Sequence, residues 1–256
     1  MNIKDYLITY LRERPLFLSL IRAKELELFS RYLPLKKSIL DVGCGDGFFA
    51  HTLFGDTLAI DVGLDVEESR QPEASRWDTY KKLVTYDGHA FPSGSRTFAT
   101  VISNCVLEHI PNLSEVVGEI YRVLKPGGYA MVSVMAKPWE EHLAGNLLLG
   151  NSYAAWMRKK QIHVNLLTDD GWTDVFRKRG FRVEKKIGYL SPAACRFIDF
   201  AHYLSLPSLL SYVLFRKWVL WMGFARLYPT KWLTALIAPD VPTKEAGAIF
   251  FVLRKK

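Results

Sequence analysis

The sequence predicts an α/β fold in which helices cover both faces of a doubly wound, mostly parallel sheet. Short apolar runs alternate with helical patterns between residues 38 and 187, and this alternation is typical of a parallel sheet. A turn with three glycines, residues 43–47, follows the first run and leads into a helical segment. Ligands of such sheets bind at the carboxyl ends of the strands, so the residues after each run are candidate site residues.

The expected elements follow from the apolar period and from helix-breaking residues. Residues 3–33 are expected to form one or two amphipathic helices, broken near Pro15. Further helices are expected at 48–54, 113–124 and 168–179, the last of them ended by Gly180. The glycine-rich stretch 125–128 is expected to stop a helix, and residues 136–168 are expected to be irregular. The expected strands lie at 38–42, 58–64, 83–86, 97–103, 129–134, 181–187 and 246–253.

Composition supports a helical cap at 1–34 followed by one large domain at 35–256 that carries an insert at about 190–240. The 256 residues are 49% apolar, enough for a full core. The three cysteines, Cys44, Cys105 and Cys195, are scattered and odd in number, which suits a reducing compartment and offers no metal-binding spacing. No metal is therefore expected. Charges run through the apolar start of the chain, so we expect no signal peptide and a cytoplasmic location, at a membrane surface or free.

The positive charge is concentrated in the C-terminal third. Residues 172–256 hold 15 Lys and Arg against 5 Asp and Glu, whereas residues 1–171 hold 19 against 21, within a net charge of +8. Such asymmetry predicts a basic face for an anionic partner, either a membrane surface or nucleic acid. The alternative is a solvated face that aids solubility.

The insert is unusually apolar. Residues 200–215 contain no Lys, Arg, Asp or Glu, and residues 218–225 form a second short apolar run bordered by basic residues. Neither run reaches the roughly 20 apolar residues that a spanning helix needs. Together they resemble an interfacial amphipathic hairpin, which predicts peripheral membrane contact through residues 200–235. A helical lid packed on the sheet edge and a homodimer face are the alternatives.

The glycine turn predicts close approach of a small ligand to the backbone. Gly43, Gly45 and Gly47 have the spacing G-x-G-x-G, whereas the dinucleotide fingerprint G-x-G-x-x-G would place its third glycine at Phe48. An oxidoreductase that uses NAD is therefore disfavoured. Asp41 stands at the end of the first expected strand, where a cationic amine could dock.

Several segments, in this order, resemble the class I S-adenosylmethionine (SAM)-dependent methyltransferases, and most closely the small-molecule enzymes often called type 11. The segments are ILDVGCGDGFFA, IDVGLD, TYDGHAFP, VISNCVLEHIPN and EIYRVLKPGGYAMVSV, within roughly residues 36–135, with weaker agreement over 164–187. The resemblance implies a Rossmann-like, seven-stranded sheet whose last strand is antiparallel. It also implies SAM as cofactor and S-adenosylhomocysteine as product.

The resemblance implies a role for several residues of the first two strand ends. The loop under the methionine part of SAM would consist of Gly43, Cys44, Gly45 and Gly47, and Asp41 would face the amino group. An acidic residue after the second strand would hold both ribose hydroxyls, because one carboxylate can accept two hydrogen bonds. Asp65 and Asp61 are the two candidates. Asp65 is favoured because its distance of eighteen residues from Gly47 is near the spacing of the family.

The resemblance also implies roles at the third and fourth strand ends. Asp87 would accept a hydrogen bond from the adenine amino group, with Gly88 and His89 beside the ring, although Asp87-Gly88 is also compatible with an ordinary turn. Asn104 and Cys105 would lie near the methionine part and the methyl group.

Catalytic residues are harder to place, because the enzyme chiefly aligns the acceptor with the methyl group and removes a proton where the acceptor requires it. Glu108 and His109 follow the fourth strand, and His163 precedes a helix on the substrate side. These three are the candidate bases, and packing roles are the alternative for both histidines. Tyr153 and Trp156 are expected either to line the acceptor pocket or to pack a lid.

The sequence favours a small, hydrophobic or amphiphilic acceptor with O- or C-methylation. The fourth strand is followed by Ser-Asn-Cys-Val at 103–106, with no N-P-P-Y-type loop, so nucleic acid is not an expected partner. The apolar insert suits a lipid-like acceptor. The alternative from another class is a catalytically silent SAM-binding scaffold, or a partner protein of a biosynthetic or membrane complex.

Overall fold

The computed structural model describes residues 1–55, 59–67 and 69–256, and the chain divides into two compact units. The core unit comprises residues 32–136, 162–187 and 249–256, and the helical unit comprises residues 1–31, 137–161 and 188–248. Each unit thus gathers segments that are far apart in the sequence.

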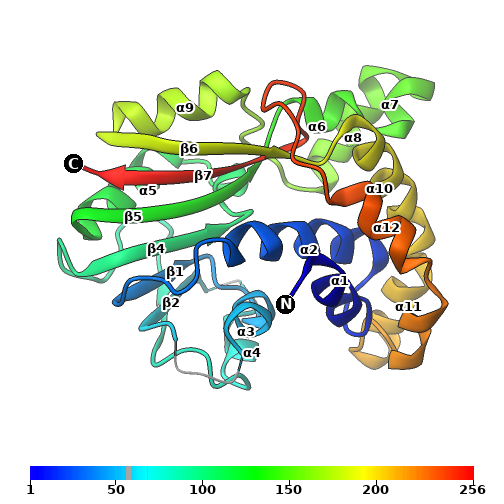
Figure 1. Ribbon diagram of the computed structural model, residues 1–256, viewed down its shortest axis with the longest axis horizontal. Helices are drawn as coiled ribbons and strands as arrows, with labels where there is room; N and C mark the ends of the chain where they lie inside the picture. The colour runs from blue at the N-terminus through cyan, green and yellow to red at the C-terminus, as the bar shows by residue number, and fades with distance from the viewer. Residues whose placement is uncertain (56–58, 68) are drawn as a thin grey trace. The chain divides into compact units, whose positions relative to one another are not determined.

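The core unit is built on a seven-stranded sheet in the order β3-β2-β1-β4-β5-β7-β6, with β7 antiparallel to the rest (Figure 1). The predicted α/β, Rossmann-like architecture is confirmed. The strands are β1 Ile39–Val42, β2 Val62–Val66, β3 Leu83–Tyr86, β4 Phe98–Asn104, β5 Leu124–Met135, β6 Phe181–Tyr189 and β7 Ala248–Lys255.

The parallel register brings the ends of neighbouring strands together. Leu40 pairs with Val62 on one side of β1 and with Val101 of β4 on the other. Beyond β1, the backbone N–H of Gly43 donates to the carbonyl of Leu64, at 2.8 Å. The carboxyl ends of β1, β2 and β4 therefore form one edge, as the switch-point rule requires.

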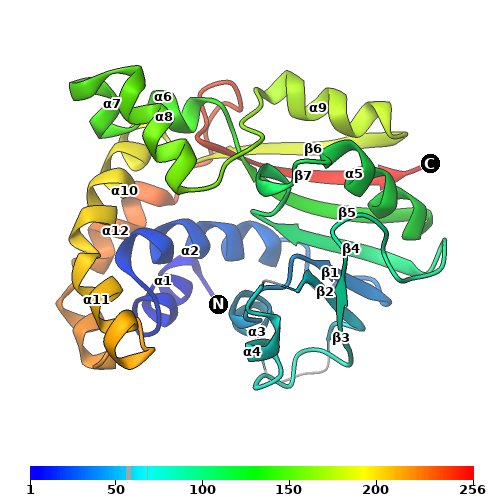
Figure 2. The same cartoon turned by 180° about the vertical axis from the view of Figure 1, so that it is seen from behind.

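The helices of the core unit lie between its strands along the chain. They are α3 Phe48–Phe54, α4 Gln71–Ala74, the 3₁₀ turn η1 Leu107–His109, α5 Leu113–Val123 and α9 Asp169–Lys178. Helices α5 and α9 lie side by side along the sheet (Figures 1 and 2). The fully buried Trp172 of α9 donates from Nε1 to the carbonyl of Met135, at 3.1 Å, and so ties α9 to the end of β5.

The helical unit consists of α1 Ile3–Leu11, α2 Leu16–Ser30, α6 Pro138–Glu141, α7 Ala144–Leu149, α8 Asn151–Lys160, α10 Pro192–Leu204, α11 Leu206–Phe215, η2 Met222–Leu227 and α12 Thr230–Ile237. The fully buried Lys24 of α2 donates to the carbonyl of Ala238 at 2.6 Å and to Asp240 at 2.7 Å. Arg31 also binds Asp240, and this hydrogen bond is the main reason why the pKa of Asp240 falls to about 2.

Three element predictions differ from the structure. Residues 136–168, expected to be irregular, contain α6, α7 and α8, whose four to ten residues are too short to produce a clear helical period. The stretch 125–128 does not separate helix from strand, because β5 already begins at Leu124. Strand β2 begins at Val62 and runs through Asp65, while the expected start at Leu58 lies outside the described residues.

Tyr153 and Trp156 both lie on α8. The buried hydroxyl of Tyr153 donates to Asp199 of α10, at 2.6 Å, which fixes α8 to α10 within the helical unit. Trp156 is 47% exposed. Tyr153 therefore packs the helical unit, one of the two roles expected from the sequence.

Candidate functional site

A cavity of about 400 Å³ opens in the core unit at the carboxyl ends of the strands, within the size range of small-ligand sites. It is lined by Gly43, Asp65, Val66, Tyr86, Gly88, Cys105, Val106, His109, Ile110, Pro111 and Asn112. The lining joins residues from the ends of four strands. Five of them were predicted from the sequence as site residues: Gly43, Asp65, Gly88, Cys105 and His109.

The glycine turn requires glycine for two separate reasons. Gly43, Gly45 and Gly47 all have positive φ, at 76°, 52° and 75°, a conformation that other residues adopt at a cost. A Cβ on Gly43 would also lie 2.3 Å from the side chain of Val106, and one on Gly47 would lie 2.9 Å from Ala74. By contrast, no described atom lies within 4 Å of a Cβ built on Gly45, so the turn is open at this point to a ligand.

Asp65 holds this turn from the neighbouring strand. One carboxylate oxygen accepts from the backbone N–H of Gly45, at 2.6 Å, and the other accepts from that of Val66, at 2.8 Å. Burial raises the pKa of Asp65, and the two N–H groups oppose this rise. Asp61, the rejected alternative, instead accepts from the N–H of Ile39 and pairs with Lys81. Asp65 therefore lines the cavity, whereas Asp61 binds the first residue of β1.

Asp41, in β1 just before the turn, and Cys44, within the turn, are both buried. Asp41 is 6% exposed, and its carboxylate accepts from the hydroxyl of Tyr80 at 2.7 Å. Burial raises the pKa of Asp41 to about 7, against the opposing hydrogen bond from Tyr80. Cys44 is buried as well, and burial raises the pKa of its thiol. In the described part of the chain, Asp41 and Cys44 do not line the cavity.

The end of β3 forms a compact turn beside the cavity. The exposed carboxylate of Asp87 accepts from the N–H groups of His89 and Ala90, at 2.8 and 3.0 Å, and these bonds lower its pKa. The carbonyl of Gly88 accepts from the side chain of Asn112, at 3.0 Å. Gly88 lines the cavity, whereas Asp87 and His89 lie outside the lining of the described part of the chain.

The end of β4 is held by Ser133 of β5. Ser133 donates to the side-chain oxygen of Asn104 at 2.6 Å, and its own hydroxyl and carbonyl accept from the N–H of Cys105. Cys105 has φ 50°, unusual for a residue with a side chain. This backbone conformation turns the chain toward η1 and leaves Cys105 in the lining of the cavity.

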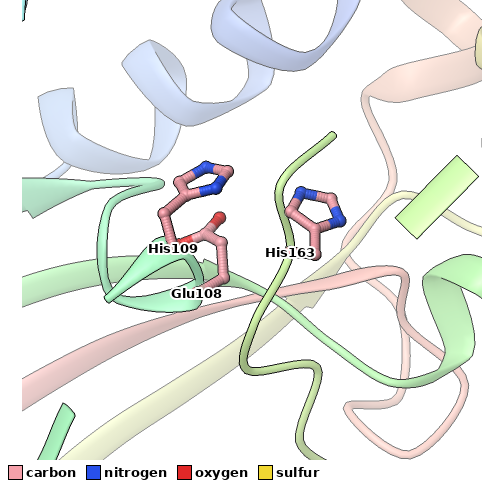
Figure 3. A group of neighbouring side chains, drawn as sticks. All are labelled: Glu108, His109 and His163. Carbon is pink, nitrogen blue, oxygen red and sulfur yellow. The ribbon is translucent and has the colours of Figure 1, made fainter. Parts of the chain in front are cut away.

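The three candidate bases come together in the fold. Glu108 and His109 are consecutive in η1, and His163 lies in the segment between α8 and α9. The ligand-type atoms of all three lie within 4.8 Å of one another (Figure 3). Only His109 of the three lines the cavity. This group therefore stands at the cavity wall nearest the end of β4.

Several lining residues were not identified from the sequence. Tyr86 directly precedes the predicted Asp87, and burial, with the nearby charges of Asp65 and Asp87, raises its pKa to about 12. Val66 directly follows Asp65 in β2, so strand-end position was the available signal for both. Outside the lining, the buried Gln71 donates to carbonyls of β2 and β3, and no motif indicated it.

The residues present fit SAM. The glycine turn offers open backbone, Asp65 offers a carboxylate at the cavity wall, and Tyr86 and Gly88 line the cavity where the resemblance places the adenine ring. A family model described as a methyltransferase domain matches residues 10–186, more than half of the chain. The chain belongs to this methyltransferase domain family. Its cofactor is SAM.

Relatives of this methyltransferase domain act on several small molecules. The chain is 31% identical over 157 residues to the sterol 24-C-methyltransferase of Schizosaccharomyces pombe, covering 53% of this chain and 42% of the relative. It is 29% identical over 133 residues to the ubiquinone biosynthesis O-methyltransferase of Paraburkholderia phymatum, covering 50% and 56%. The chain thus spans about half the length of these curated relatives.

Solved structures establish the fold alone. A SAM-dependent methyltransferase of Thermotoga maritima is 17% identical with a TM-score of 0.61, covering 94% of this chain and 92% of that one. The cyclase SpnF is 18% identical with a TM-score of 0.59, covering 91% and 80%. Because a cyclase shares the fold, the fold by itself does not fix the reaction.

Replacing Asp65 by Asn is expected to weaken S-adenosylhomocysteine binding about 10- to 100-fold, because a hydrogen bond to a charged group contributes roughly 1.5–3 kcal/mol. Isothermal titration calorimetry measures this loss. The control is Asp61→Asn, which changes the other acidic candidate and is expected to leave the affinity within about twofold. Equal losses in both variants would contradict the assignment of Asp65.

The raised pKa of Asp41 predicts a pH-dependent stability. The folded protein holds this proton more tightly than the unfolded chain, whose pKa is about 3.9, so ionisation of Asp41 lowers the free energy of unfolding as the pH rises from about 4 to about 7. The variant Asp41→Asn keeps an oxygen that accepts from Tyr80, but it cannot ionise, so its free energy of unfolding does not fall for this reason. We expect the variant to gain stability relative to the wild type between pH 5 and 8, on the order of 1–4 kcal/mol, measured by urea unfolding.

The control for this experiment is Asp87→Asn. Asp87 has a lowered pKa and is ionised in both states across that window. The difference in free energy of unfolding between Asp87→Asn and the wild type is therefore expected to stay constant across this pH range. A pH profile of Asp41→Asn parallel to that of the wild type would contradict a buried, proton-retaining carboxyl group.

Proposed function

We propose that this protein is a SAM-dependent methyltransferase whose acceptor is a small amphiphile reached at a lipid surface. The observation that carries the acceptor class is a continuous stretch of the helical unit whose large apolar side chains are exposed. The apolar surface is defined as Phe200, Tyr203, Leu204, Leu206, Leu209, Leu210, Val213, Leu214, Phe215, Leu220, Trp221, Met222, Phe224, Leu227 and Trp232, each at least 41% exposed.

The charges around the apolar surface favour an anionic lipid surface. The sequence has no Asp or Glu between Asp199 and Asp240, whereas Arg216, Lys217, Arg226 and Lys231 lie within this interval. Basic residues beside exposed leucines and tryptophans are the composition of interfacial helices. Among the described residues, no single helix has the length and apolarity to cross a membrane, and only α10 and α11 together, bent by 44°, meet that criterion.

A cavity within the helical unit supports an amphiphilic ligand. It has a volume of about 370 Å³, and its apolar lining comes chiefly from the segment after α11, including Trp218, Leu220 and Phe224, whereas α11 contributes Pro207 and two serines. Arg14, only 7% exposed, is the one charged residue among the described residues of this lining. An apolar pocket with one cation suits an acyl or isoprenoid chain with a polar head.

Two of the relatives support this acceptor class, whereas another acts on malonyl-acyl-carrier protein. The names of two of them mention a sterol and ubiquinone, both poorly soluble molecules, and the corresponding enzymes methylate carbon and oxygen. Bound SAM would supply an electrophilic methyl group. The chain would contribute orientation of the acceptor, exclusion of water and, for a hydroxyl acceptor, a proton acceptor from the group formed by Glu108, His109 and His163. The alternative, a silent SAM-binding scaffold, would need the same cavity but no acceptor.

The acceptor class is tested with SAM carrying a tritiated methyl group, incubated with the full chain and either a bacterial lipid extract or a water-soluble metabolite extract. We expect label in the organic phase, reduced about tenfold or more in Asp65→Asn through its weaker cofactor binding. Label in the aqueous fraction alone would contradict an amphiphilic acceptor. Absence of label in both, with S-adenosylhomocysteine binding intact, would favour the scaffold.

The membrane contact is tested by flotation with phosphatidylcholine vesicles that contain about one-third phosphatidylglycerol. The double variant Leu210→Asp, Leu214→Asp changes two α11 residues that are 59% and 63% exposed, and is expected to lower vesicle binding tenfold or more, since each buried leucine contributes roughly 1.5–3 kcal/mol. Lys185→Glu, an exposed residue of the core unit, makes the same change in net charge and is the control. Equal binding of both variants would contradict contact through the apolar surface.

A further inference from the structure

Three side chains that commonly bind metals converge beside the cavity of the core unit. Glu108 and His109 come from η1, and His163 comes from a segment 54 residues further along the chain. One ligand-type atom from each lies within 4.8 Å of the other two. In Figure 3 the carboxyl group of Glu108 lies beside the His109 ring, and the His163 ring faces them from the neighbouring segment. The centroids of the two rings are 5.2 Å apart.

Backbone hydrogen bonds fix this convergence. The carbonyl of Glu108 accepts from the N–H groups of Val164 and Asn165, both at 2.8 Å. The side chain of Asn165 donates in turn to the carbonyls of Leu107 and Ile110, at 3.2 and 2.6 Å. The segment with His163 is therefore joined to η1 on both sides of Glu108. The group is pre-organised by the chain, as a metal site requires.

The contacts of two members match those of metal ligands. His109 Nδ1 lies 3.0 Å from the carbonyl of Ile162. Because a carbonyl only accepts, Nδ1 carries the proton and Nε2 keeps a lone pair, the tautomer that metal-binding histidines have. The carboxylate of Glu108 is fully buried, and one oxygen accepts from the N–H of Met135 at 3.2 Å. Such second contacts orient a ligating carboxylate.

We propose that Glu108, His109 and His163 bind one divalent transition-metal ion, of the kind represented by Zn²⁺ or Mn²⁺. Two imidazoles and one carboxylate leave coordination positions for water or a substrate. Metal–ligand bonds of roughly 2.1 Å place tetrahedral ligand atoms about 3.4 Å apart. Since the ligand-type atoms lie within 4.8 Å of one another, they would have to approach by at most about 1.4 Å. Because backbone hydrogen bonds hold the His163 segment against η1, this approach would come from rotation of the side chains.

The position of the group assigns a role to the metal, and this role rests on the proposed methyltransferase function. His109 also lines the cavity, together with Ile110. A metal held there would bind an acceptor oxygen and lower its pKa, so that its proton passes to solvent and not, as in the metal-free case, to one of these three side chains. The oxygen would then form a bond to the methyl carbon while the carbon–sulfur bond of SAM breaks. The electron pair of that bond goes to sulfur, which gives the neutral thioether. The acceptor would therefore be an alcohol or a phenol.

Metal binding is measured directly on the full chain after treatment with a chelator, by calorimetric titration with Zn²⁺ and by electron paramagnetic resonance with Mn²⁺. We expect one saturable site per chain. His163→Ala and Glu108→Gln are each expected to weaken Zn²⁺ binding tenfold or more, with S-adenosylhomocysteine affinity changed less than about twofold. His142→Ala, a half-buried histidine of the helical unit, is the control and should leave metal binding unchanged.

The outcomes separate the metal site from the methyltransferase function. Absence of saturable binding, or binding that is undiminished in His163→Ala, overturns the metal site even where SAM-dependent methyl transfer is found. Binding with the expected loss in both variants supports the site even where no acceptor is methylated. Methyl transfer at an undiminished rate after chelation of a bound metal overturns the assigned role of the metal in the reaction.

Discussion

The hydrogen bond from the Gly45 N–H to the Asp65 carboxylate, at 2.6 Å, is the interaction on which the cofactor end of the site depends. The turn after β1 has three residues with positive φ and so has no regular structure of its own to hold it. Its position comes from the end of β2, through Asp65 and through the carbonyl of Leu64, which accepts from Gly43. The same carboxylate stands at the cavity wall. One residue therefore shapes the turn and also lies at the cavity wall, and the two N–H groups that it accepts from offset part of the cost of burying its charge.

A second set of contacts holds the part of the site at η1 and the end of β4. The N–H of Met135 donates to Glu108 and its carbonyl accepts from Trp172, so the last residue of β5 links η1 to α9. Ser133, two residues earlier, fixes Asn104 and Cys105 at the end of β4. The wall with the candidate bases is thus tied to β5 and α9, whereas the glycine turn is tied to β2. The glycine turn and the wall with the candidate bases are therefore held by separate parts of the same sheet.

The sequence predicted the strand ends well because strands β1, β3 and β4 are short apolar runs bounded by turn residues, and the α3 helix was predicted with its observed bounds, Phe48–Phe54. The helices of 138–160 were missed because elements of four to ten residues carry little period. The pairing of Asp41 with Tyr80 could not be predicted, since it joins residues 39 positions apart through tertiary packing. The prediction that the protein binds no metal rested on the spacing of the cysteines. It missed the group of Glu108, His109 and His163 because His163 comes close to the other two only in the folded chain.

The helical unit has an unusual distribution of charge and apolar surface. Lys24 and Glu25 are fully buried, and Asp199 is 3% exposed, each held by hydrogen bonds within the unit. Outside, six large apolar side chains of α11 are each at least 49% exposed. A soluble bundle gains most of its stability by burying leucine and phenylalanine, roughly 1.5–3 kcal/mol for each fully buried side chain. The exposed side chains of α11 do not contribute this free energy to folding, so burying them in an apolar phase would stabilise association with that phase. Because the only charges between Asp199 and Asp240 are basic, an anionic lipid surface fits this face better than a neutral or acidic protein partner.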